Sequence, residues 1–262
     1  MAFNISPSWG LRPALPQTGG LNFKPPQGSR YELPNGLVVY LLKDNTLPVI
    51  HIAAIARTGK IYDTKEKIGL GELTVNLLKD GGTLRHKSDE IDKTLEFLGA
   101  SVETSIAFEE ARVTMFTLKK DLDKVLDIYA SVLMEPAFED DKVALKKTEA
   151  LEMIRRRNDD PSREAQREAL RYFYGADHPY GWRQELSTVE PLTKADLKAW
   201  HGNYFKPNNI IIAAAGDFGS EEAFLEKLKE DLGGWPRGDV NFPVIPPAAP
   251  KADRQVYFID RD

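Results

Sequence analysis

The stretch that starts the fold spans residues 30–42 and reads RYELPNGLVVYLL. Residues 30–33 and the apolar run 37–42 flank Pro34-Asn35-Gly36. Asn-Gly favours a tight hairpin turn because both residues tolerate positive φ. The next apolar run, 49–57, is nearly continuous, which is typical of a strand buried on both faces. The stretch and its neighbour therefore predict a β-hairpin followed by an interior strand.

Helical and strand patterns alternate in blocks after residue 57. Leucines 70, 73, 77 and 78 recur on one helical face, and Gly81-Gly82 ends that helix. Ser88 suits the N-cap of a second helix, which Gly99 ends. The other predicted elements are strands 100–108, 111–118 and 210–216, the last of them buried, and helices 122–134, 140–158, 162–174, 193–200 and 220–232.

The order of these elements predicts an α+β domain with a largely antiparallel or mixed sheet and helices packed on one face. Residues 1–28, rich in Pro and Gly, predict an irregular N-terminal arm, and 29–235 predict the domain itself. Residues 236–262 predict a proline-rich linker and, at 255–259, the first strand of a second domain. We therefore expect the chain to be the N-terminal domain or half of a longer protein.

The amino-acid composition excludes several kinds of binding site and catalytic residue. Lys and Arg total 35 and Asp and Glu total 40, so the net charge is −5, which argues against nucleic-acid binding through phosphates. The chain has no cysteine, which excludes disulfides, thiolate metal sites and a cysteine nucleophile. No segment approaches the ~18–20 apolar residues of a membrane span. Of the four histidines, no two lie within one helical turn, and His51 is expected at an interior or edge position.

Short motifs recur in a specific order between residues 28 and 235: Asn35-Gly36-Leu37-Val38-Val39, Ala56-Arg57-Thr58-Gly59, Gly69-Leu70, Gly82-Thr83, Leu98-Gly99-Ala100, Glu135-Pro136-Ala137-Phe138, Asp159-Asp160-Pro161, His178-Pro179-Tyr180-Gly181 and Tyr204-Phe205-Lys206-Pro207-Asn208-Asn209. Each motif alone is weak, but their order and spacing are specific. Together they resemble the pitrilysin/insulinase family of zinc metallopeptidases, in particular its mitochondrial-processing-peptidase-like branch.

The resemblance implies an inverted zinc motif, H-x-x-E-H, on the helix that follows Gly69-Leu70. In that motif two histidines bind zinc and the glutamate activates the metal-bound water. The corresponding positions here are Glu72, Val75 and Asn76. Counted back from Asp159-Asp160-Pro161, the third ligand position falls near Met153. Both histidines and the catalytic glutamate are therefore absent from the expected positions.

The resemblance then implies a member with no catalytic residues and no cofactor of its own. We expect the non-catalytic subunit of a two-chain zinc metallopeptidase, which pairs with an active zinc-bearing subunit and helps to enclose and bind peptide substrates. One alternative is a metallopeptidase with substituted ligands, in which Glu72 holds a metal with Glu149 or Glu152. Another is a peptide-binding or scaffold module without a protease partner. The sequence does not determine the cellular compartment, and the resemblance to the family suggests the bacterial periplasm.

The resemblance also implies where a peptide binds. In active relatives the substrate adds a strand to the sheet edge beside the zinc helix. The matching strand is 101–106, whose candidate substrate-binding residues are Glu103, Thr104, Ser105 and Ile106. An ordinary edge strand that Glu103 protects against aggregation explains this segment equally well. His178 and Tyr180 are further candidates, although a structural turn with a capped histidine accounts for them too.

Overall fold

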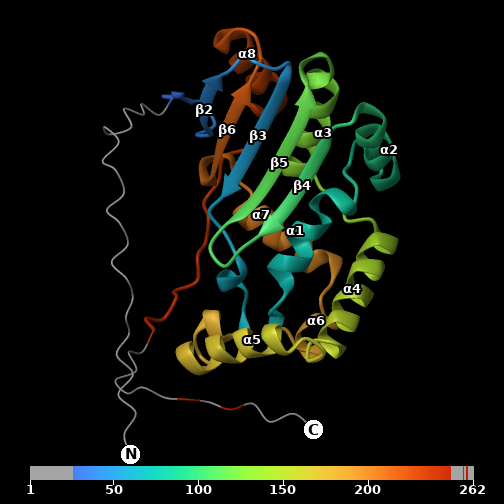
Figure 1. Cartoon of the computed structure of the whole chain (residues 1–262), viewed down its shortest axis with the longest axis vertical. Coiled ribbons are helices and arrows are strands. Elements are labelled where there is room, and N and C mark those ends of the chain that lie inside the picture. Colours follow the sequence, from blue (N-terminus) through green and yellow to red (C-terminus); the bar gives the residue numbers. More distant parts are fainter. Residues whose placement is uncertain (1–25, 249–255, 257, 259–262) are drawn as a thin grey trace, which may run out of the picture.

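The computed structural model describes residues 26–248, 256 and 258. It contains one six-stranded sheet in the order β1-β2-β6-β3-β5-β4 (Figure 1). The strands are β1 (Ser29–Glu32), β2 (Val38–Lys43), β3 (Val49–Ala56), β4 (Ser101–Ile106), β5 (Ala111–Leu118) and β6 (Ile210–Gly216). Strands β2 and β6 pair in parallel and the other neighbours are antiparallel, so the predicted mixed sheet is confirmed.

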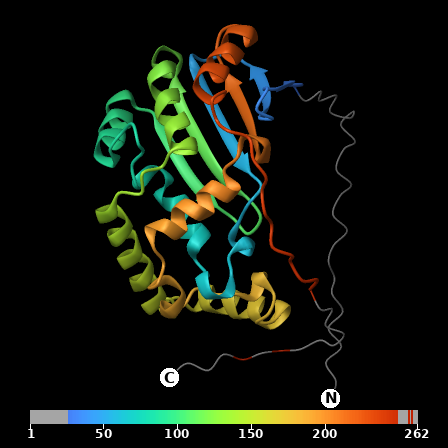
Figure 2. The ribbon, with the colours of Figure 1, turned by 180° about the vertical axis from the view of Figure 1, so that it is seen from behind.

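Six of the eight helices in the described part of the chain form two groups. Helices α3, α7 and α8 cover one face of the sheet, whereas α4, α5 and α6 lie beyond one of its ends (Figures 1 and 2). The helix bounds are α1 (Leu70–Asp80), α2 (Ser88–Leu98), α3 (Leu122–Met134), α4 (Asp140–Arg155), α5 (Pro161–Tyr174), α6 (Leu186–Val189), α7 (Lys194–Tyr204) and α8 (Glu221–Leu232). Short 3₁₀ turns are η1 (Lys60–Tyr62), η2 (Lys65–Lys67), η3 (Lys119–Asp121), η4 (Pro179–Gly181) and η5 (Pro207–Asn209). Among the described residues, no helix is long and apolar enough to cross a membrane.

The hairpin turn between β1 and β2 forms at the predicted residues, although Gly36 and not Asn35 has a positive φ. Gly36 has φ 85°, which suits glycine, and the Leu33 amide donates to the Leu37 carbonyl at 2.9 Å. The Asn35 side-chain amide donates to the carbonyl of Leu232 at 2.9 Å. The turn that defines the start of the domain is therefore also fastened to the last helix, α8.

The sheet buries only one face, contrary to the expectation for residues 49–57 and 210–216. In β3, Ile50 and Ile52 are buried against the helices, whereas the intervening His51 is exposed. Strand β6 alternates in the same way, and Ile211 is 46% exposed. The error arose because alanine and isoleucine also occupy the uncovered face, which hides the period-two pattern. His51 consequently lies on a central strand, in contact with the Phe116 ring.

Three predicted helix boundaries are corrected. Helix α2 has Lys87 rather than Ser88 at its N-cap, because the Lys87 amide donates to the Glu90 carboxylate three residues on. Helix α4 ends at Arg155 instead of residue 158, and α7 continues to Tyr204 instead of residue 200. None of these changes alters the order of the elements.

The segment after α8 stays close to the domain. Residues 236–248 form neither helix nor strand. The Asn203 amide and its carbonyl oxygen pair with the backbone of Asn241 at 2.9 and 3.1 Å, and Asn208 binds Gly238 in the same way. Most of the predicted arm 1–28 and of the predicted strand 255–259 lies outside the described residues.

A glycine in α1 sets how closely the helix packs. An added Cβ at Gly71 would lie 2.9 Å from the ring of Trp200 and 3.2 Å from Ile106. We predict that Gly71→Ala lowers the free energy of unfolding by about 1–3 kcal/mol, as overpacking does, despite the better helix propensity of alanine. Gly202 in α7 has no atom within 4 Å of such a Cβ, so Gly202→Ala should raise stability by about 0.5–1 kcal/mol. Urea unfolding of both variants measures the opposite signs, and a shift in the same direction would contradict the close packing at Gly71.

A buried histidine predicts acid sensitivity. The His201 Nε2–H donates to the Leu133 carbonyl at 2.9 Å, and burial lowers the pKa of His201 to about 4. Between pH 6.5 and 4 the unfolded chain gains a proton at this residue that the folded chain does not, so about 3 kcal/mol of stability is lost over this window. His201→Gln keeps an N–H donor but does not titrate. Urea unfolding at several pH values should show a flatter acid limb for His201→Gln; identical limbs would refute the assignment.

Candidate functional site

The start of α1 is anchored by a buried carboxylate. One oxygen of Asp63 accepts from the Gly69 amide at 2.8 Å and the other from the Gly71 amide at 2.9 Å. Gly69 has φ 105°, a conformation that only glycine adopts readily. Asp63 is 4% exposed, and desolvation raises its pKa to about 7 although both amide bonds favour the charged form. Asp63 therefore fixes the first turn of α1 beside a cavity.

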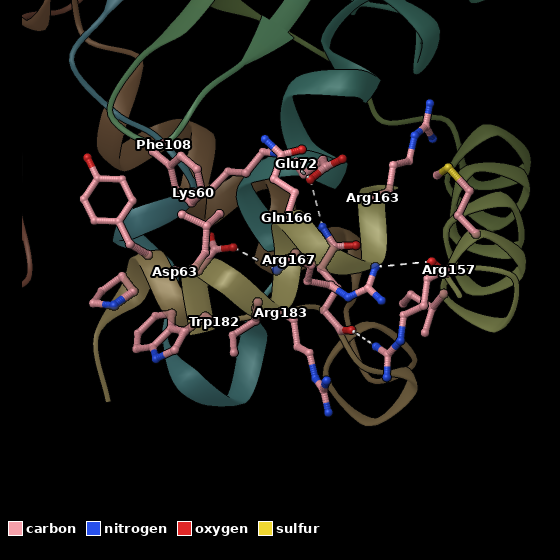
Figure 3. A pocket seen from close by; sticks show the side chains of 18 residues that line it. Lys60, Asp63, Glu72, Phe108, Arg157, Arg163, Gln166, Arg167, Trp182 and Arg183 are labelled. Atoms are coloured by element: carbon pink, nitrogen blue, oxygen red, sulfur yellow. Dashed lines mark hydrogen bonds and ion pairs between the residues drawn. The ribbon is translucent and has the colours of Figure 1, made fainter. Parts of the chain in front are cut away.

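This cavity has a volume of about 390 Å³ and opens between α1, α5 and the segment that contains η4 (Figure 3). Apolar groups such as Phe108, Leu170 and Trp182 form part of its wall. A smaller adjoining cavity of about 140 Å³ lies between α1 and α4. The two cavities share Glu72, Met153 and Gln184 in their walls.

The structure brings most of the zinc-motif positions together. Glu72 lines both cavities, Asn76 lines the smaller one, and the 63% exposed Met153 faces both from α4. Val75 does not join them, because its side chain is fully buried in the core. The positions placed by counting from Gly69-Leu70, Glu72 and Asn76, therefore lie close to Met153. The position of Met153 was counted back from Asp159-Asp160-Pro161 across a helix that contains no motif of its own.

The carboxylate of Glu72 is already engaged. The Lys60 ammonium lies 2.6 Å from it, and the Gln184 side chain donates to it at 2.9 Å (Figure 3). Glu149, which also lines the smaller cavity, pairs with Lys146 at 3.2 Å.

These side chains do not fit a catalytic zinc ion. Glu152, the other candidate ligand, pairs with Arg155 on its own helix. Catalytic zinc prefers histidine-rich sets of three protein ligands. Within residues 26–248, 256 and 258, no group of three or more His, Asp or Glu side chains is placed to hold a metal ion.

Four arginines around the larger cavity were not predicted as site residues. Figure 3 shows Arg157, Arg163 and Arg167 on the side opposite Lys60 and Phe108. The wall also contains Arg183. They come from the end of α4, from α5 and from the segment after η4, so only the fold assembles them. One sequence signal was present, because residues 163, 167 and 171 are arginines spaced four apart on one helical face.

Strand β4 is one of the two edge strands of the sheet, as the sequence indicated. The Ala107 amide donates to the Glu110 carbonyl at 2.8 Å, which fixes the phase of the β4–β5 ladder. Bonded pairs alternate in an antiparallel ladder, so the amides and carbonyls of Val102, Thr104 and Ile106 point away from β5. Helix α1 packs beside β4, and Phe108, just beyond the strand, lines the cavity. An added strand on β4 would therefore lead to the cavity.

The two loop candidates have different environments. His178 is 7% exposed, and its Nδ1 accepts from the Tyr180 amide at 3.2 Å, so it caps the η4 turn. Its ring stacks on those of Tyr174 and Tyr180. Tyr180 lines the cavity and donates to the carboxylate of Glu109, which raises the pKa of Tyr180 to about 12. The capped-turn alternative thus describes His178, whereas Tyr180 reaches the cavity.

The fold and the site together are those of a metallopeptidase-like domain, with a helix at the zinc-helix position beside a free strand edge. The family described as Insulinase (Peptidase family M16) matches residues 38–177, and the family described as Peptidase M16 inactive domain matches residues 191–262. The chain therefore belongs to peptidase family M16, the insulinase family, as the motifs indicated.

Relatives agree with this assignment. The chain is 26% identical to the zinc protease PqqE of Helicobacter pylori, over 76% of this chain and 45% of that protein. It is 23% identical to cytochrome b-c1 complex subunit 1 of Bos taurus, over 73% of this chain and 40% of that protein. The chain thus spans about half the length of these relatives.

Solved structures show the same fold. The peptidase M16 inactive domain from Pseudomonas fluorescens superimposes with a TM-score of 0.79 at 24% identity, over 86% of this chain and 55% of that chain. The periplasmic protease PqqL from Escherichia coli gives a TM-score of 0.74 at 19% identity, over 84% of this chain and 25% of that chain.

Proposed function

We propose that the chain is part of a non-catalytic subunit of a two-chain zinc peptidase, which binds and helps to enclose peptides that an active partner hydrolyses. The observation that carries the proposal is the identity and environment of the residues at the zinc-motif positions of α1. Val75 stands in the core where the family places the proton-accepting glutamate, and Glu72 is neutralised by Lys60. A valine side chain accepts no proton, so water activation at this helix has no base.

The relatives support a role in proteolysis beside other chains. PqqE of Helicobacter pylori is named a zinc protease, which agrees with peptides as the class of substrate. Cytochrome b-c1 complex subunit 1 of Bos taurus is by its name a subunit of a larger complex. A subunit role for a family M16 chain therefore has a precedent among the relatives of this protein.

The peptide would bind by strand addition to β4. The outward amides and carbonyls of Val102, Thr104 and Ile106 supply sequence-tolerant hydrogen bonds. Glu103 and Ser105 are exposed on this strand, so their side chains are free to contact the added peptide. Tyr180 lines the cavity to which the peptide would lead.

The catalytic part is tested by reconstitution. The full-length protein should associate with a family M16 chain that carries H-x-x-E-H, and should raise peptide hydrolysis above that of the zinc chain alone. The rise is expected because the second chain completes the substrate chamber. Size-exclusion chromatography and a fluorogenic peptide assay measure both effects.

Metal analysis supplies the control for reconstitution. Stoichiometric zinc in the protein alone, lost together with activity in Glu72→Ala, would instead identify a metallopeptidase with substituted ligands. A zinc chain that is fully active alone and never associates with this protein would refute the two-chain proposal. Peptide binding that persists in that case would identify a binding module without a protease partner.

The peptide-binding part is tested by backbone N-methylation of an extended, fluorescently labelled peptide. Each peptide carries one N-methyl group, and the methylated position is moved along the chain. At every second position the methyl group should weaken binding at least about fivefold, the equivalent of one hydrogen bond of about 1 kcal/mol. Methylation of the intervening amides should be tolerated because they face away from β4. Fluorescence anisotropy measures the pattern, and an effect without period two would contradict strand addition.

A further inference from the structure

The larger cavity has an excess of positive groups. Its cationic lining residues are Lys60, Arg157, Arg163, Arg167 and Arg183. Among the described residues, the only acidic side chains in its wall are Asp63 and Glu72. Lys60 pairs with Glu72, and both oxygens of Asp63 accept backbone amides. The four guanidinium groups therefore have no acidic partner in the wall itself.

Two carboxylates behind the wall neutralise part of this charge. Glu185 lies 2.9 Å from Arg157, and it also accepts from Arg183 at 2.6 Å. Glu168 accepts from Arg183 at 2.9 Å and is approached at 3.8 Å by Arg171, which does not line the cavity. These two carboxylates are thus shared by several guanidinium groups, and Arg183 makes the shortest contact with each carboxylate.

Arg167 has the weakest charge pairing of the half-buried arginines in the wall, which are Arg157, Arg167 and Arg183. Its guanidinium donates to two neutral acceptors, the Arg157 carbonyl at 3.2 Å and the Asn158 side chain at 2.7 Å. Its Nε–H is buried without a hydrogen-bond acceptor, and Glu168 approaches no nearer than 3.9 Å. Arg163, at the rim, has only Asp160 at 3.4 Å, and its side chain is 84% exposed. Both arginines therefore keep N–H groups and charge for a ligand.

We propose that this cavity binds a carboxylate group of the peptide and thereby makes the chain selective for acidic peptides. The inference rests on the proposed function, because the peptide reaches the cavity from β4. Guanidinium groups bind carboxylates with paired, charge-assisted hydrogen bonds. Apolar groups of Phe108, Leu170 and Trp182 in the wall make the surroundings less polar than water, which strengthens such bonds. A lysine or arginine side chain of the peptide would meet like charge there.

The test compares labelled peptides that differ only by Glu or Gln at one position, scanned along the peptide, with the full-length protein. At the position that enters the cavity, the Glu peptide should bind about tenfold more tightly, as expected for one charge-assisted contact. Arg163→Gln and Arg167→Gln should each reduce this preference. The Arg163 side chain is 84% exposed, so Arg163→Gln should leave the fold intact and keeps the test decisive if Arg167→Gln is unstable.

Arg155→Gln is the matched control. It removes the same charge at the end of α4, but Arg155 does not line the cavity. The preference for Glu should persist in this variant. Equal binding of Glu and Gln peptides at every position would overturn the selectivity for acidic side chains. An equal loss of the preference in Arg155→Gln would overturn the assignment of that preference to the cavity.

A second pair of peptides separates the two sources of a carboxylate. If amidation of the C-terminus weakens binding while Glu→Gln does not, the cavity holds the C-terminal carboxylate. The carboxylate site then stands, and the selectivity for acidic side chains is overturned. Equal binding of all these peptides with a period-two N-methylation pattern would overturn the acidic selectivity and leave strand addition intact. Absence of binding by every peptide would refute the proposed function as well.

Discussion

The hydrogen bonds from the amides of Gly69 and Gly71 to the buried carboxylate of Asp63 determine the position of α1. An aspartate at a helix N-terminus satisfies orphan amides and interacts favourably with the helix dipole. Here it does so in a buried place, where the cost of desolvation is high. Such a contact persists because α1 packs against both β4 and α7. Asp63 thus fixes the helix at the family's zinc-motif position, and that helix packs against the edge strand β4.

From this anchor the geometry of the site follows. With the first turn of α1 fixed, Glu72 lies within reach of Lys60 in η1 and of Gln184 in the segment after η4. The same placement turns Val75 into the core and leaves Asn76 at the smaller cavity. A substitution at one motif position therefore changes the chemistry of the cavity without changing the backbone that lines it.

Local patterns were enough to predict the elements, whereas the contacts between distant segments were not. The turn at Asn35-Gly36, the leucine spacing of α1 and the edge position of β4 follow from periodicity, turn chemistry and motif order. Helices on one face of the sheet were predicted, but the alternating burial of β6 was missed because Ile211 is apolar although 46% exposed. Lys60 and the arginines were missed because their proximity depends on how η1, α4 and α5 pack, which no local pattern encodes.

The positive groups that surround the cavity can bind but cannot activate water. A catalytic zinc ion both polarises a carbonyl and lowers the pKa of its bound water, which supplies a nucleophile. Arginine keeps its proton at any physiological pH, and it only donates hydrogen bonds. Asp63, whose pKa is about 7, has both oxygens occupied by backbone amides and is buried. The positive groups around the cavity therefore attract the oxygen atoms of a peptide without supplying a nucleophile, which agrees with the proposed substrate-holding role.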